Sequence, residues 1–262
     1  FVQDQFMRDA YALTERGNTH VHFVGSTKLD ALIAELQSLP KHENGKTLLW
    51  APHHSYSLHW LNFGNFAQVR EEMLEWASEH PEFKIVLRPH PFMFGTMVDR
   101  GIMTAHELQN WMDWWNALPN TAIDITSSSA QAFAVADYLL TDGISYLAEW
   151  PVAVGKPAIF LENPKHWQFT ALGELAASTS QKISMISELE SAIVSMPERA
   201  LEIMELRHKV LPKPGRVANR ILEVVAADAV SGAGGQLPDL VDVAAIKSLP
   251  WELQANREPL SD

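Results

Sequence analysis

One segment of this 262-residue chain constrains its fold more than any other. Residues 138–161 read YLLTDGISYLAEWPVAVGKPAIFL: an apolar run, a short polar turn, a helical stretch and a second apolar run. Buried strands joined by a helix are typical of a parallel sheet. In such a sheet the turn lies at the carboxyl edge of the first strand, where ligands bind. Small residues there let backbone N–H groups approach an anion closely, so we expect an anion-binding turn.

The same alternation of strand and helix patterns runs through most of the chain. The sequence predicts strands over residues 20–24, 46–51, 84–88, 121–125, 138–141 and 157–161. It predicts helices over residues 2–16, 65–80, 108–118, 129–137, 187–194, 197–210 and 216–227, with further helices beginning near residues 27 and 144. Strands that alternate with helices indicate an α/β fold, a Rossmann-like doubly wound parallel sheet with right-handed connections.

Composition limits the classes of function. No run of about 18 apolar residues is present, so the sequence predicts no bilayer-spanning helix. The absence of Cys excludes a disulfide scaffold and Cys-based catalysis or zinc binding, and is compatible with a reducing cytoplasm. The net charge of −12 argues against a general nucleic-acid surface. It leaves room for a small basic pocket, where the local potential governs binding.

Three parts of the chain are expected. The chain opens at Phe1 without Met, and its first residues already read as structure, so we expect the carboxyl-terminal part of a longer protein. Residues 1–40 would be the end of a preceding domain and a linker, and residues 41–228 the Rossmann-like domain. Residues 229–262 would be a flexible tail, because they begin with an Ala-, Ser-, Gly- and Pro-rich stretch and have little core potential.

Polar residues follow four of the predicted strands. They are His53, His54 and Ser55 after the first of these strands, Arg88 and His90 at the end of the next, the serines of 127–129, and Thr141, Asp142, Gly143 and Ser145. Because the carboxyl ends of parallel strands form one rim, these residues should converge on one crevice. A cation, imidazoles, hydroxyls and a helix N-terminus together suit a phosphorylated nucleotide.

The histidines admit a metal-binding alternative, which we weigh against phosphate binding. Adjacent side chains such as His53 and His54 point apart in an extended loop, and no HxH, HExxH or nearby carboxylate pair completes a site. We therefore expect no metal and no other cofactor. Pro89 and Pro91 fix the backbone around His90, which favours a functional role for Arg88 and His90 over a structural one.

The two carboxylates near this crevice have alternative roles. An ionised Asp142 aimed at a phosphate would repel it, so we expect Asp142 to orient backbone or a histidine; Asp142 or Ser145 could also cap the following helix. Glu149 lies one helical turn beyond Ser145. It could accept hydrogen bonds from ribose hydroxyls or pair with Lys156.

Three segments together resemble one known family. They are LLWAPH at residues 48–53, VLRPHP at 86–91, and ADYLLTDGIS with a following Glu and GKPAIF within 136–160. In this order they resemble the carboxyl-terminal half of the CDP-glycerol glycerophosphotransferase family, over about residues 20–228. Enzymes of that family build teichoic acids and related capsular polymers on a GT-B scaffold.

The resemblance implies roles for particular residues. The carboxyl-terminal domain of the family binds the CDP-activated donor, and His90 matches a His implicated in transfer, with Arg88 beside it. Ser145 matches one of two phosphate-binding serines, whereas Ile144 stands at the other and Gly143 replaces an aromatic residue or Cys. The donor- and phosphate-binding set would be His53, His54, Ser55, Thr141, Asp142, Gly143, Ser145, Tyr146 and Glu149.

The resemblance also implies an activity. The chain would belong to a transferase that moves glycerol phosphate, or a related polyol phosphate, from a CDP-linked donor to a cell-surface polymer or lipid-linked acceptor. It would act in the cytoplasm with at most peripheral contact to the inner membrane face, with no nucleic-acid partner. Residues 1–40 would then end an amino-terminal acceptor domain, and a second family His in that domain has no counterpart here.

Two other functions remain open. The first is a GT-B glycosyltransferase that uses a nucleotide-sugar in capsule or lipopolysaccharide synthesis. The second is an inactive nucleotide-binding fragment. The sequence features that separate these functions from glycerophosphate transfer are weak.

Overall fold

The computed structural model describes residues 1–40, 45–57, 59, 61–126 and 128–230. The chain divides into two compact units, Phe1–Val217 and Ala218–Asp262. The first unit contains the sheet and all the residues discussed below. Of the second unit, the structure describes the helix α11 (Val217–Val230).

Within the first unit, the described strands form one parallel sheet. Their order is β3-β2-β1-β4-β5-β6, and every neighbouring pair is parallel. The strands are β1 (Thr47–Ala51), β2 (Lys84–Leu87), β3 (Thr121–Ile123), β4 (Tyr138–Thr141), β5 (Ile159–Leu161) and β6 (Gln181–Ile183). This order confirms the predicted Rossmann-like doubly wound fold.

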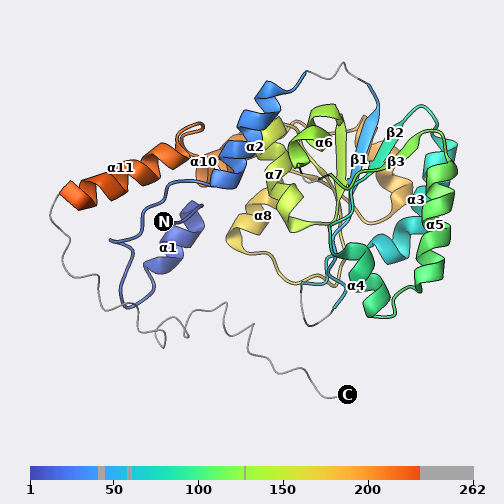
Figure 1. The fold of residues 1–262 in the computed structure, drawn as a ribbon, viewed down its shortest axis with the longest axis horizontal. Helices are drawn as coiled ribbons and strands as arrows, with labels where there is room; N and C mark the ends of the chain where they lie inside the picture. Colours follow the sequence, from blue (N-terminus) through green and yellow to red (C-terminus); the bar gives the residue numbers. More distant parts are fainter. Residues whose placement is uncertain (41–44, 58, 60, 127, 231–262) are drawn as a thin grey trace. The chain divides into compact units, whose positions relative to one another are not determined.

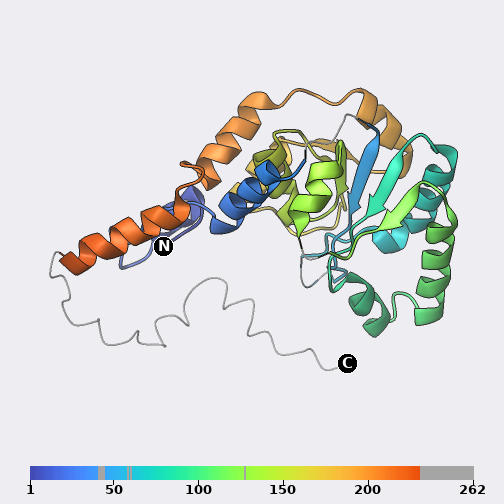
Figure 2. The ribbon, with the colours of Figure 1, turned by 45° about the horizontal axis from the view of Figure 1, so that its top comes forward.

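Helices cover both faces of the sheet. Figure 1 shows α3 and α5 on one side of the strands and α2, α6, α7 and α8 on the other, and Figure 2 shows the same strands after a 45° turn. The helices of this unit are α1 (Gln5–Tyr11), α2 (Thr27–Ser38), α3 (Phe66–Glu79), α4 (Met93–Asp99), α5 (Ala105–Ala117), α6 (Ser129–Val135), α7 (Ile144–Val154), α8 (Ala171–Ser178), α9 (Leu189–Val194) and α10 (Ala200–Val210), with the 3-10 turn η1 (Ile186–Glu188). None of the described helices is long and apolar enough to cross a membrane.

The core explains why the strands read as continuous apolar runs. Every residue of β1 is buried, because helices pack on both of its faces. Toward α3 and α5, Trp50 stacks on Phe66 with ring centroids 5.3 Å apart and tilts against Trp115 at 5.6 Å. Aromatic pairs at these separations contribute beyond their buried area.

Some predicted elements differ from the structure. The strand predicted over residues 20–24 is wrong: only Phe23 forms a bridge, to Val2, because a single short segment lies beside it. The sequence also missed α4, α8 and β6. The strand β6 is polar and half exposed, so it lacks the apolar run that marks the inner strands.

The predicted domain boundaries fall partly outside the described residues. Positions 41–44, at the expected start of the Rossmann-like domain, and positions 231–262 of the expected tail are not described. Residues 1–40 belong to the same compact unit as the sheet, and α2 packs against α6 and α7. Their assignment to the end of an acceptor domain stays a prediction.

The strand order creates a switch point between β1 and β4. The chain runs outward from β1 through β2 and β3 on one side and through β4, β5 and β6 on the other. In this kind of sheet a crevice opens where the order reverses, outside the carboxyl ends of the strands. Ala51 pairs with Thr141, so the segments that follow these two residues leave the sheet side by side.

Trp50→Ala tests this core. Removing the indole leaves a cavity among buried aromatic rings, so we expect the free energy of unfolding to fall by about 3–5 kcal/mol in denaturant titrations. Trp114 is the matched control: it lies on α5 next to buried Trp115 but is 56% exposed. Trp114→Ala should change stability by less than about 0.5 kcal/mol. Equal losses in the two variants would contradict this description of the core.

Candidate functional site

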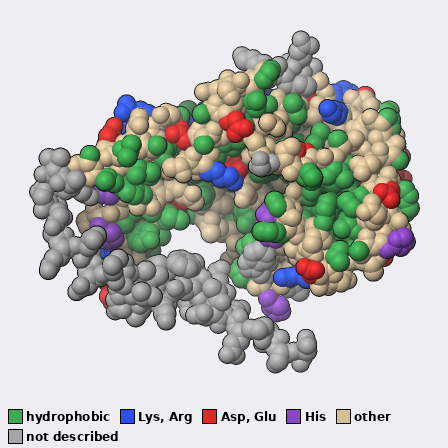
Figure 3. Space-filling view, in the orientation of Figure 1, with side chains coloured by type: hydrophobic (Ala, Val, Ile, Leu, Met, Phe, Trp, Pro, Cys, Tyr) green, Lys and Arg blue, Asp and Glu red, His purple; other side chains and the backbone are tan. Residues whose placement is uncertain are grey.

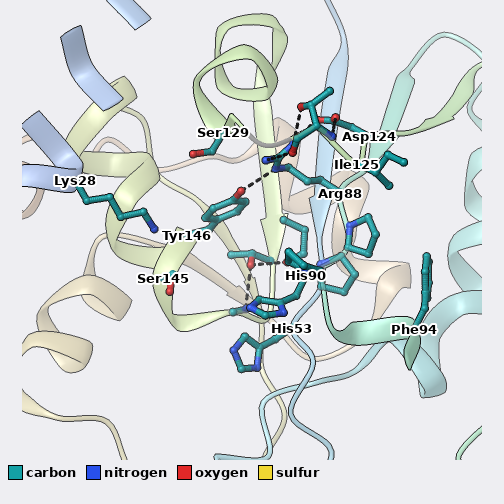
Figure 4. A pocket seen from close by; sticks show the side chains of 17 residues that line it. Lys28, His53, Arg88, His90, Phe94, Asp124, Ile125, Ser129, Ser145 and Tyr146 are labelled. Atoms are coloured by element: carbon teal, nitrogen blue, oxygen red, sulfur yellow. Dashed lines mark hydrogen bonds and ion pairs between the residues drawn. The ribbon is translucent and has the colours of Figure 1, made fainter. Parts of the chain in front are cut away.

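A cavity of about 580 Å³ lies at the switch point (Figure 4). Its lining residues are Lys28, Ala51, Pro52, His53, Arg88, Pro89, His90, Pro91, Phe94, Asp124, Ile125, Thr126, Ser129, Thr141, Gly143, Ser145 and Tyr146. Most of them lie at or just after the ends of β1, β2, β3 and β4, and the others include Lys28 from α2 and Phe94 from α4. The structure thus brings together the four strand ends that the sequence places on one rim.

The predicted residues divide into two groups. His53, Arg88, His90, Thr141, Gly143, Ser145 and Tyr146 line the cavity. His54, Ser55, Asp142 and Glu149 are not among the lining residues, and the last three are buried. The structure gives these four supporting positions, because each contacts a residue that does line the cavity.

The Asp142 carboxylate connects the end of β4 to the segment after β1 and to the start of α3. Its Oδ1 accepts a hydrogen bond from the His53 N–H and its Oδ2 accepts one from the Asn65 N–H, both at 2.6 Å. Burial raises the pKa of Asp142 to about 7, although the two amides favour the ionised form. Asp142 therefore orients backbone, as expected.

The N-terminus of α7 is open toward the cavity. Its N-cap is Gly143, and no side chain of the described residues caps the first turn, so capping by Asp142 or Ser145 is wrong. The first N–H groups of a helix have no partner within the helix. A Cβ at Gly143 would lie 3.3 Å from Thr141 Oγ1 and 3.4 Å from the His53 ring. This close approach explains why a residue without a side chain stands there.

Three imidazoles form a cluster beside this helix end, in which His54 stacks on His90 and His53 is tilted against both. The ring centroids of His54 and His90 are 3.8 Å apart, and those of His53 and His54 are 4.5 Å apart. Burial is the largest cause that lowers the pKa of each ring, to about 3 for His53 and about 4 for His54. Repulsion between the rings adds to this effect for His53 and His54. All three are therefore neutral at pH 7.

Backbone amides assign the tautomers of two of these rings. The Ser55 N–H donates to His53 Nδ1, and the Phe92 N–H donates to His90 Nδ1, both at 3.2 Å. Because an amide can only donate, each neutral ring carries its proton on Nε2. His53 and His90 are therefore hydrogen-bond donors at Nε2. Among the described residues, no group of three or more His, Asp or Glu side chains is arranged to hold a metal ion.

Arg88 follows β2 and connects the loop after β3 to the first turn of α7, which follows β4. Its Nε donates to the Tyr146 hydroxyl at 2.8 Å, and its Nη1 donates to Asp124 Oδ2 at 2.6 Å. Further bonds run from Nη1 and Nη2 to the hydroxyl and carbonyl oxygens of Thr126. The planar guanidinium is held in one orientation, which fixes Tyr146 and the loop after β3 around the cavity.

Several lining residues were missed by sequence reasoning. Asp124 and Thr126 follow β3, so the strand-end argument applies to them, and Ser129 belongs to the serines noted there; Ser127 is not described. Phe94 and Lys28 come from helices rather than strand ends, and no sequence pattern signals which way those helices pack.

Glu149 pairs with a lysine that the sequence did not suggest. Its Oε1 lies 2.5 Å from the Nζ of Lys28 on α2. Lys156 instead donates to the Asp137 carbonyl oxygen at 3.4 Å, so the expected alternative of a Glu149–Lys156 pair is wrong. The other predicted partner of Glu149, a ribose hydroxyl, stays a prediction.

Comparisons with known proteins establish the fold. No family model matches the chain, and no curated protein matches it. Among solved structures, UDP-GlcNAc 2-epimerase from Neisseria meningitidis bound to UDP-GlcNAc is 16% identical, with a TM-score of 0.56 over 87% of this chain and 61% of that one. The UDP-GlcNAc 2-epimerase of Methanocaldococcus jannaschii, in complex with UDP-GlcNAc and UDP, has 15% identity and a TM-score of 0.55 over 87% and 60%.

A third structure is that of the wall teichoic acid polymerase TagF, H444N variant. It is 11% identical, with a TM-score of 0.52 over 89% of this chain and 58% of that one. The chain shares its fold with one part of each of these structures. The chain spans about 60% of the length of the structures it matches.

His54→Gln tests the histidine cluster through stability. The unfolded chain binds protons at its histidines below their ordinary pKa of 6.5, whereas the folded cluster does so only at lower pH. The cluster therefore reduces the free energy of unfolding as the pH falls from about 6.5 to about 3, and the part due to His54 lies between about 6.5 and about 4. We expect a shallower acid-side loss in His54→Gln than in the wild type, measured by denaturant titration at each pH.

Asp142 supplies the internal reference for this comparison. Its raised pKa has the opposite effect on stability. The stabilisation from Asp142 is fully present below pH 3.8 and is lost as the pH rises through about 7. Both proteins contain Asp142, so the difference between their pH profiles isolates His54. Parallel profiles would contradict the low pKa of His54.

Proposed function

We propose that this cavity binds the phosphates of a nucleotide-activated donor. The observation that carries the proposal is the uncapped start of α7 facing the same cavity as the Nε2–H donors of His53 and His90. Oriented N–H groups at a helix N-terminus favour anions. A volume of about 580 Å³ is in the range of small-molecule sites.

The proposed site binds the nucleoside as well as its phosphates. Glu149 Oε2 is buried and has no hydrogen-bond partner among the described residues, whereas Oε1 is held by Lys28. An unsatisfied buried carboxylate oxygen is costly. Glu149 does not itself line the cavity, but its partner Lys28 does, so a ligand hydroxyl that reaches past Lys28 would relieve that cost. A ribose hydroxyl is the partner that a nucleotide offers.

For the reaction, we propose transfer of glycerol phosphate from a CDP-linked donor to a polymer or lipid-linked hydroxyl. The acceptor oxygen attacks the β-phosphorus, and the bond from that phosphorus to the bridging oxygen breaks. CMP leaves with the electron pair, and the acceptor proton passes to a base. The sequence resemblance supports this donor, and the likeness to TagF agrees with it at the level of the fold.

The tautomers define what the histidines do in this reaction. His90 has its Nδ1 engaged by the Phe92 amide and its proton on Nε2, so it donates a hydrogen bond rather than accepting a proton. His90, the α7 amides and the fixed charge of Arg88 would stabilise the developing charge on the phosphates. We assign the general base to the acceptor-binding part of the protein, outside this cavity.

A second candidate is a GT-B enzyme that acts on a nucleotide-sugar. Two of the structures similar in fold contain UDP-GlcNAc, and Gly143 and Ile144 depart from the glycerophosphotransferase motif. In sugar transfer the attack is at the anomeric carbon, and a nucleoside diphosphate leaves. Both candidates act in the cytoplasm with at most peripheral membrane contact, and neither needs a metal in this cavity.

His90→Ala tests the proposed role of the imidazole. Loss of one preorganised donor to the transition state costs about 10²–10³-fold in kcat, so we expect that loss in the full-length protein, with the folding transition unchanged. His106→Ala is the control, because His106 is an exposed residue of α5 away from the cavity. Full turnover in His90→Ala would contradict the proposed role of His90 in stabilising the transition state.

The released nucleotide distinguishes the two reactions. Glycerophosphate transfer from CDP-glycerol should release CMP, whereas sugar transfer should release a nucleoside diphosphate. We expect CMP when the full-length protein is incubated with CDP-glycerol and acceptor, measured by anion-exchange chromatography. Release of UDP from a UDP-sugar, with no CMP from CDP-glycerol, would select the second candidate. Tight CDP binding without any turnover would indicate a non-catalytic nucleotide-binding protein.

A further inference from the structure

Two cationic side chains line the cavity, and they differ in how they are held. Arg88 and Lys28 are the Arg and Lys residues of the described lining. Each lies against a carboxylate: Arg88 against Asp124 at 2.6 Å, and Lys28 against Glu149 at 2.5 Å. The difference between them lies in the N–H groups that each has left for a ligand.

The guanidinium of Arg88 is largely committed. It has five N–H groups, and four hydrogen bonds connect it to Tyr146, Asp124 and Thr126. Its plane is fixed by partners on both sides of the switch point. Arg88 therefore contributes a positive field and a rigid wall, with little capacity for further hydrogen bonds.

The ammonium of Lys28 has more capacity. It carries three N–H groups, and among the described residues it interacts with Glu149 Oε1. Its side chain is 67% exposed, so a ligand in the cavity has access to it. Figure 4 shows Lys28 reaching from α2 toward Ser145 and Tyr146, the first turn of α7. The ammonium and the uncapped helix start therefore face the same part of the cavity.

Glu149 holds the ammonium in place. Glu149 is only 7% exposed. Lys28 projects from α2, which packs against α7. Moving Lys28 away would leave a buried carboxylate without its counter-charge, which is strongly unfavourable. The remaining N–H groups of Lys28 are therefore the ones available to donate to a ligand while the ion pair stays intact.

We propose that Lys28 binds a phosphate oxygen of the donor and that Glu149 is the positioning residue that holds its ammonium at the start of α7. This inference rests on the proposed donor-phosphate site and adds to it a residue that precedes the sheet. An anion there meets helix amides on one side and a fixed ammonium on the other. Such an arrangement orders the ligand at little further entropic cost to the protein.

The test measures ligand affinity by calorimetry in the full-length protein, with CDP and inorganic pyrophosphate as probes. Loss of a charge-assisted hydrogen bond should weaken both probes about 10- to 100-fold in Lys28→Met. Lys28→Arg keeps the charge and should retain most of the affinity. The affinity of the wild type should also fall more steeply with salt than that of Lys28→Met, because one charge contact is screened.

Lys182→Met is the matched control. Lys182 is also about half exposed and forms an ion pair with a glutamate, Glu162, at 2.6 Å, but it does not line the cavity. We expect unchanged affinity for CDP and pyrophosphate in this variant. Thermal unfolding of all variants checks that the fold is retained.

The outcomes separate this inference from the proposed function. Wild-type affinity for CDP and pyrophosphate in Lys28→Met would overturn the role of Lys28 and leave the donor site standing. Equal losses in Lys28→Met and Lys28→Arg would also overturn it, because charge would then not be the cause. Lys28-dependent binding of pyrophosphate without binding of CDP or UDP would support Lys28 and refute the nucleotide donor. A wild type that binds neither probe would refute both.

Discussion

The buried carboxylate of Asp142 is the interaction on which the site depends. It lies at the end of β4 and accepts the backbone N–H groups of His53, after β1, and Asn65, at the start of α3. Both donors are backbone N–H groups, so a change of side chain at either position leaves these hydrogen bonds in place. The bonds fix where the loop after β1 leaves the sheet, and with it the position of His53 beside Gly143. These two hydrogen bonds therefore determine the shape of the cavity.

The cavity is suited to anions without being strongly cationic. Asp124 and Glu149 compensate its two cations, and the histidine cluster is neutral at pH 7. In the proposed function, attraction for phosphate would therefore come from oriented N–H groups, which act at short range. Figure 3 shows charged side chains of both signs dispersed over one face of the molecule. Selectivity would therefore depend on local geometry more than on long-range steering.

The sequence predicts the sheet and much of the site for the same reason. Inner strands such as β1 and β4 are buried on both faces, so they read as apolar runs, and polar residues just after them stand out. That argument found His53, Arg88 and His90 at the cavity. It could not find Lys28, because helical periodicity shows which face of α2 is apolar but not which helix it packs against. It placed Asp142 near the site and left open whether its carboxylate would orient backbone or a histidine; the structure shows that it orients backbone.

The pairing of β1 with β4 also has a consequence for how the protein folds. The Thr47 N–H donates to Asp137 across 90 positions of sequence, and His53 and Asp142 are 89 positions apart. Closing a loop of about 90 residues costs about 4 kcal/mol of chain entropy, before any constant term. The segments β1–β2–β3 can associate over shorter loops, but the cavity exists only after the later half of the sheet has joined them. Ligand-binding capacity should thus be among the last properties that the folding chain acquires.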